Sequence, residues 1–171
     1  MNPQAPDPTP DANSDDELAI SLVTTTCGLV EEYLADFGDS FSAVEDGVYF
    51  AKKGSTLLAI HVVPFNHDAL VHISANVVRE AKLDSSLLRM LLEQNYRSSF
   101  GSFGLSPDGT ITLRHSLLGS TLEREQLIPA VVRVARKADE WDDKIIALAG
   151  GENAVDTLRK QADRHDADAA G

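Results

Sequence analysis

The chain has 171 residues, of which 43% are hydrophobic, and 15 Lys and Arg against 27 Asp and Glu give it a net charge of −12. At this length about 70% of the unfolded surface is buried on folding, which predicts one domain with its own core and excludes wholesale disorder. The negative charge disfavours phosphate backbones and anionic lipids, so we expect no nucleic-acid or membrane partner, and it favours basic clients.

Cys27 is the single cysteine of the sequence, which excludes an intrachain disulfide and a cysteine-based zinc cluster. The first residues carry no cationic start and no apolar signal-peptide segment, and no apolar run is long enough to span a membrane. We therefore expect a protein of the reducing cytoplasm.

Residues 1–13 contain four prolines and almost no apolar side chain, so we expect them to form a disordered leader. Ser14 and Glu17 then have the spacing of a capping box, which predicts that a helix and the folded domain, residues 14–150, begin there. Gly38 can adopt the left-handed backbone conformation that ends a helix, so we expect the helix to stop there. The predicted apolar stripe of this helix consists of Leu18, Leu22, Leu29, Tyr33 and Phe37.

Over residues 41–78 the apolar period changes to two, and turn residues interrupt it at three places, which predicts a strand meander. If Asn66 and His67 form the tip of the third turn, the flanking strands pair so that residue numbers sum to 133. One face of this pair then forms the core, with Leu58, Ile60 and Val62 opposite Ala75, Ile73 and Val71.

The other face of the same pair carries Leu57, Val63 and Leu70 among polar residues, and it is too apolar for an ordinary solvent-facing sheet. We expect it to be a contact surface. The register also sets His61 directly opposite His72. Two imidazoles can share a metal, but neither strand supplies an obvious third ligand on that face, so we expect no metal or other cofactor.

After residue 78 the sequence predicts a helix, a hairpin and a long helix. Asp84 caps a helix, Pro107-Asp108-Gly109 predicts a three-residue hairpin turn, and a second capping box at Ser120 opens a long helix that ends near Gly150. Residues 151–171 are expected to form a short C-terminal helix and a disordered tail. The predicted stripe of the Asp84 helix consists of Leu87, Leu88, Leu91 and Leu92.

This order of elements predicts an α+β fold, in which three to four helices flank a twisted antiparallel sheet of about five strands. We recognise no pattern of catalytic residues in the sequence. In the acidic run at residues 139–143 we expect Asp139, Asp142 and Asp143 to be solvated. Trp141, within that run, is either a core anchor or the apolar centre of an interface with an acidic rim.

The segments Leu91-Leu92-Glu93-Gln94-Asn95 and Phe100-Gly101-Ser102-Phe103-Gly104-Leu105, with the Pro107-Asp108-Gly109 turn, Leu113-Arg114 and the Ala138–Asp142 stretch, resemble the YbjN family. That family is related to the chaperones of type III secretion, and the resemblance covers about residues 16–147. It implies a helix-flanked twisted antiparallel sheet, commonly dimeric, whose apolar surfaces hold an unfolded segment of a client protein.

The sequence therefore predicts a non-enzymatic, homodimeric module that binds a client protein or peptide. The partner-binding residues are expected to be Leu57, Val63, Leu70 and Trp141. The alternative is a metal- or ligand-responsive stress or sensory regulator of the same fold, built on His61 and His72.

Overall fold

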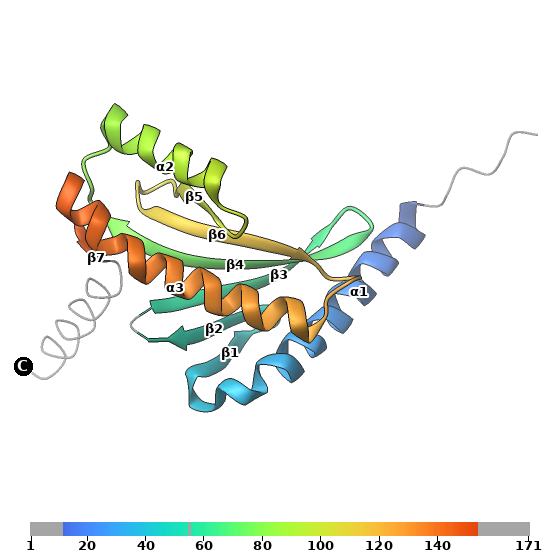
Figure 1. Ribbon diagram of the computed structural model, residues 1–171. Coiled ribbons are helices and arrows are strands. Elements are labelled where there is room, and N and C mark those ends of the chain that lie inside the picture. Colours follow the sequence, from blue (N-terminus) through green and yellow to red (C-terminus); the bar gives the residue numbers. More distant parts are fainter. Residues whose placement is uncertain (1–11, 55, 154–171) are drawn as a thin grey trace, which may run out of the picture.

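The computed structural model describes residues 12–54 and 56–153, which form three α-helices and a seven-stranded antiparallel sheet (Figure 1). The α+β class is confirmed. Along the chain the elements are α1 (Ala12–Leu34), the 3-10 helix η1 (Ala35–Ser40), β1 (Phe41–Glu45), β2 (Val48–Lys53), β3 (Thr56–Phe65), β4 (Asp68–Arg79), α2 (Ser85–Arg97), β5 (Ser102–Leu105), β6 (Ile111–Leu118), α3 (Arg124–Ala149) and β7 (Glu152–Asn153).

The strands lie in the order β1-β2-β3-β4-β6-β5, and β7 pairs with the end of β4. The sheet is larger than the expected five strands, partly because Glu152 and Asn153 pair with Arg79 and Val78 where a helix was expected. Residues 1–11 of the predicted leader and residues 154–171 of the predicted helix and tail lie outside the described residues. None of the described helices is both long and apolar enough to cross a membrane.

The register predicted for the central strand pair is confirmed. Leu58, Ile60 and Val62 pair with Ala75, Ile73 and Val71, and all six side chains are buried. Asn66 adopts a left-handed φ of 51° at the tip of the turn, a conformation that asparagine tolerates better than most residues. The alternation of the sequence therefore placed the core face of the sheet correctly.

Helices α1 and α3 pack on this core face, and Figure 1 shows both in front of the sheet, with α2 beside β5 at its upper edge. The core side chains of α1 differ from the predicted stripe. Val30 and Leu34 are fully buried, whereas Leu29 and Tyr33 are only partly buried against the core. The helix is also longer than expected, since it already includes Ala12.

Helix α2 begins as predicted, because the Asp84 carboxylate accepts hydrogen bonds from the backbone N–H groups of Ser86 and Leu87. Its predicted four-leucine stripe is only half correct. Leu87 and Leu91 are buried, whereas Leu92 is 68% exposed. The hairpin is confirmed, with Leu105 paired with Ile111 and Phe103 with Leu113.

Candidate functional site

The sheet face opposite α1 and α3, here called the open face, is covered by no helix of the described residues. Its side chains alternate with the buried ones along β2, β3, β4 and β6 and are half-buried or exposed. The apolar members of the open face are Val48, Phe50, Leu57, Ala59, Val63, Phe65, Leu70 and Leu118.

Val63 and Leu70, two of the predicted partner-binding residues, lie side by side on the open face. Val63 of β3 pairs with Leu70 of β4, which in turn pairs with Leu118 of β6. Val63 and Leu70 are half-buried and Leu118 is 46% exposed, so three adjacent strands present one apolar row. Leu57 is six positions away from Val63 along β3, roughly 20 Å, and lies beside Lys52 instead.

The middle of the open face is polar. His61 pairs with His72 as predicted, and Ser116 of β6 lies on the far side of His72. The Nδ1 atom of His72 is 2.8 Å from the Ser116 hydroxyl. Burial lowers the pKa of His72, and the positive charges of Arg114 and His61 lower it further. Among the described residues, no group of three or more potential ligands gathers around these imidazoles.

A hollow of about 580 Å³ continues the open face toward β5. It is lined by side chains of β4 and β6, including Ser74, Asn76 and Arg114, and by the β5 hairpin. Gly104 faces this hollow and leaves the β5 backbone uncovered by a side chain. This end of the open face therefore combines polar side chains with the apolar surface of the β5 hairpin.

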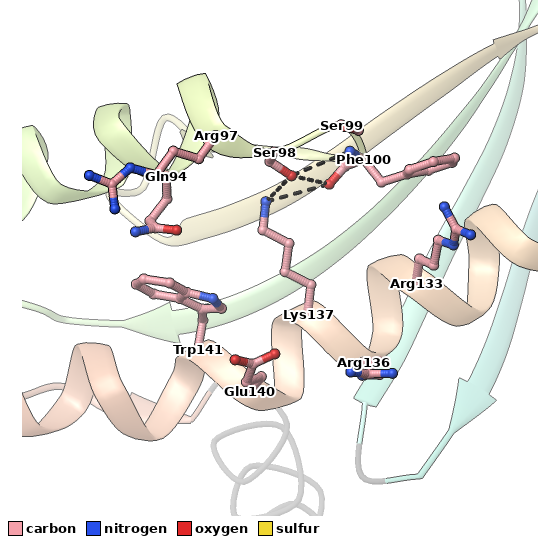
Figure 2. Close-up of a pocket in the computed structure, with 10 residues that line it drawn as sticks. All are labelled: Gln94, Arg97, Ser98, Ser99, Phe100, Arg133, Arg136, Lys137, Glu140 and Trp141. Carbon is pink, nitrogen blue, oxygen red and sulfur yellow. Dashed lines mark hydrogen bonds between the residues drawn. The ribbon is translucent and has the colours of Figure 1, made fainter.

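Trp141 does not lie on the open face. It lines a separate cavity of about 380 Å³ between α2, the following loop and α3, here called the α2–α3 groove (Figure 2). The groove is lined by Gln94, Arg97, Ser98, Ser99, Phe100, Arg133, Arg136, Lys137, Glu140 and Trp141.

Lys137 crosses the α2–α3 groove and fastens the loop after α2 to α3, as Figure 2 shows. Its ammonium group donates to the Ser98 hydroxyl at 2.7 Å and to the carbonyl oxygens of Gly101 and Phe100 at 3.0 and 3.4 Å. All three acceptors are neutral. Burial lowers the pKa of Lys137, although the nearby Glu140 carboxylate opposes that shift.

Trp141 combines the two roles that the sequence left open. On its inner side Trp141 packs against the core, because its ring contacts the buried Phe103 ring edge-on at a centroid distance of 5.5 Å. Its outer side faces the groove, where the Lys144 ammonium lies 4.8 Å from the ring centroid. Of the acidic run around this tryptophan only Glu140 lines the groove, together with four cations, so the rim is predominantly basic and not acidic as the second alternative required.

The aspartates next to Trp141 do not line the groove, because the helical period of α3 turns them toward other sides of the helix. Asp142 is buried rather than solvated, which corrects the expectation for that residue. Its carboxylate accepts from the Asn153 side chain and from the Asp143 backbone N–H. Burial raises the pKa of Asp142. The partner Asn153 comes from the short strand β7, and the sequence of α3 around Asp142 does not predict this contact.

The cations of the groove were missed because they come from separate segments of the chain. Arg97 ends α2, whereas Arg133, Arg136 and Lys137 recur at helical spacing on α3. That spacing on α3 was a usable signal. A second missed surface is the outer side of α2, where Leu92 and Tyr96 are 68% and 93% exposed beside a hollow of about 650 Å³.

Solved complexes contain chains with the same fold, and one of them is described as a chaperone–effector complex. A chain of the ExsC–ExsE complex matches with a TM-score of 0.56 and 19% identity, over 70% of this chain and 95% of that one. A chain of the HopA1–SchA chaperone–effector complex matches with a TM-score of 0.53 and 9% identity, over 78% and 99%. A chain of the heterodimeric ExoU–SpcU complex from the type III secretion system of Pseudomonas aeruginosa gives 0.51 and 13%, over 68% and 97%.

None of the curated proteins matches the sequence. A family model described as T3SS (YopN, CesT) and YbjN peptide-binding chaperone 1 matches residues 25–157, which is most of the chain. The resemblance drawn from the α2, hairpin and α3 segments is thereby confirmed. The chain belongs to this family of peptide-binding chaperones.

Proposed function

We propose that this protein is a non-enzymatic, cytoplasmic chaperone or adaptor that holds an apolar segment of a client protein on the open face. The observation that carries the proposal is the apolar row of Val63, Leu70 and Leu118 on a sheet face that no helix of residues 12–153 covers. Exposed apolar surface of this kind is typical of a docking site. The peptide-binding chaperone family and the chaperone–effector complex among its structural neighbours support the same role.

The open face suits an extended peptide for two physical reasons. The apolar row offers shallow contacts to alternate side chains, and the hollow beside Gly104 offers polar side chains, including Ser74, Asn76 and Arg114, that can bond a peptide backbone. Extended peptides gain affinity from backbone hydrogen bonds and specificity from side-chain contacts. Leu57, at the other end of β3, extends the contact along the strand.

The decisive experiment compares two leucine substitutions that add the same charge. Leu70→Asp places a carboxylate in the middle of the apolar row, whereas Leu148→Asp alters a 66% exposed leucine near the end of α3, away from the open face. Tagged full-length protein is used to capture clients from its native cells under crosslinking, and each captured protein is quantified by mass spectrometry. We expect Leu70→Asp to lower client recovery at least about tenfold and Leu148→Asp to leave it unchanged.

Equal recovery by both variants would contradict the role of the open face. A far-UV circular dichroism spectrum identical to that of the wild type excludes misfolding as the cause of any loss.

We further propose that the protein is a homodimer formed through the outer side of α2. Leu88, Leu92 and Tyr96 recur every four residues and so share one helix face, which two copies can bury against each other. We expect light scattering of the wild type to give twice the monomer mass and Leu92→Asp to give the monomer mass. Leu148→Asp is again the matched control, and a monomeric wild type would refute the dimer.

The regulator built on His61 and His72 remains an untested alternative. The two imidazoles do lie opposite each other, but no observation on the described residues favours a metal there over the Ser116 hydroxyl that His72 already contacts.

A further inference from the structure

We infer that the α2–α3 groove binds an acidic segment of the client, in which carboxylate side chains alternate with apolar ones. The inference rests on the proposed client-binding function and assigns a chemical class to part of the bound client. It reverses the expectation of basic clients that followed from the net charge of the chain.

The first observation is the concentration of positive charge in an acidic protein. Four of the ten residues that line the groove are cations, namely Arg97, Arg133, Arg136 and Lys137, in a chain with a net charge of −12. Glu140 is the one carboxylate among the lining residues, and it is held by Lys144 at 2.9 Å. Local potential rather than net charge decides which ligands a cleft attracts.

The second observation concerns the short ion pairs of the chain. The pairs Arg79–Asp108, Arg124–Asp36 and Lys144–Glu140 involve none of the four, and Glu140 attracts Arg136 and Lys137 only at longer range. The bonds of Lys137 go to the Ser98 hydroxyl and to two carbonyl oxygens, which carry no charge. The lining therefore carries four positive charges against the one carboxylate of Glu140, and an anionic ligand can bind the cations with charge-assisted hydrogen bonds.

The third observation is that aromatic surface alternates with the cations. The Arg133 guanidinium lies 4.3 Å from the centroid of the Phe100 ring, which orients its N–H groups, and Trp141 lines the other end of the groove. From residue 133 to residue 141, α3 rises roughly 12 Å. A single phosphate group cannot reach cations spread over this length, whereas a peptide with carboxylates separated by apolar residues matches both the charges and the rings.

The test uses full-length protein and two fluorescein-labelled peptides of equal length, one alternating glutamate with leucine and one alternating lysine with leucine. We expect the acidic peptide to bind, with an affinity that falls as salt is raised, and the basic peptide to bind at least about tenfold more weakly. The double variant Arg133→Glu/Arg136→Glu should lower the affinity for the acidic peptide at least about tenfold.

Lys82→Glu is the control for a charge reversal outside the groove, because Lys82 is exposed in the loop before α2 and does not line the groove. It should leave the affinity within about twofold of the wild type, since exposed distant charges are screened. Circular dichroism checks that the variants remain folded. Binding unaffected by the double variant, or equal binding of the two peptides, would overturn the inference.

Two further outcomes would also overturn it. Inorganic phosphate that displaces the acidic peptide at concentrations where chloride does not would assign the groove to a phosphate group. Self-association of the wild type that is lost in the double variant would assign it to a second copy of the chain.

The inference can fail separately from the proposed function. If Leu70→Asp abolishes client capture while the acidic peptide does not bind, only the assignment of the groove is wrong. If the acidic peptide binds as expected while Leu70→Asp captures clients normally, the open face is wrong and the groove stands.

Discussion

The open face and the α2–α3 groove differ in how they combine apolar surface with charge. On the open face, the apolar row of Val63, Leu70 and Leu118 lies beside a polar centre that contains His61 and His72. In the groove, the rings of Phe100 and Trp141 alternate with cations. We propose an apolar strand as the ligand of one surface and an acidic segment as the ligand of the other, although both surfaces belong to one strongly acidic chain.

The comparison teaches that net charge is a weak guide to local recognition. Exposed carboxylates such as Glu32, Glu125 and Asp143 lie on the outer surfaces of α1 and α3, where they promote solubility. The binding surfaces are formed by the small set of side chains that the fold turns toward them. In the groove the helical period selects Arg133, Arg136 and Lys137, and it directs the buried Asp142 toward Asn153 instead.

The largest expected effect contrasts the two faces of β3 with adjacent leucines. Leu58 is fully buried on the core face, whereas Leu57 is half-buried on the open face. Leu58→Ala should lower the free energy of unfolding by about 2 to 5 kcal/mol because it leaves a cavity in the core. Leu57→Ala should cost about 1 kcal/mol or less. Urea unfolding measures both, and equal losses would show that the open face is in fact packed.

A smaller effect separates anchoring from recognition within the groove. Lys137→Met removes the donor shared by Ser98, Phe100 and Gly101 and should cost about 1 to 3 kcal/mol, since those acceptors lose their bonds. Arg136→Met removes the same charge from an exposed side chain and should stay within about 0.5 kcal/mol of the wild type. If the two variants lose the same stability, Lys137 does not brace the loop.

The smallest effect concerns the polar centre of the open face. Because the folded state lowers the pKa of His72 below its ordinary value of 6.5, the unfolded chain takes up a proton more readily. The stability that neutral His72 contributes is present above pH 6.5 and is lost as the pH falls through the lower pKa of the folded state. The wild type should therefore lose more stability on acidification than His72→Gln. Urea unfolding across a pH series checks this, and parallel curves would contradict it.

The sequence predicted best where structure depends on neighbours in the chain. The alternation in residues 41–78 and the turn at Asn66 set the register of β3 and β4, and with it the positions of Val63 and Leu70 on one face. The Asp84 cap and the Pro107-Asp108-Gly109 turn are equally local, since each satisfies backbone groups within a few residues.

The sequence predicted worst where segments far apart in the chain compete for the same groups. The expected cap at Ser120 does not form, because α3 begins at Arg124 and the Ser120 hydroxyl donates to Asp68 at 2.6 Å instead. Nothing near Asn95 in the sequence predicts that its side chain bonds both the N–H and the carbonyl of Phe103. The groove belongs to this class, because α2 and α3 contribute its cations from distant positions.

The central claim is that a client segment lies on the open face. Its most direct test places the photocrosslinking residue benzoylphenylalanine at position 63, 70 or 148 of the full-length protein and maps adducts by mass spectrometry after illumination in native cells. We predict that positions 63 and 70 crosslink to the same segment of the same client, and that position 148 does not. Adducts at position 148 alone, or none at positions 63 and 70 while clients are still captured, would contradict the claim.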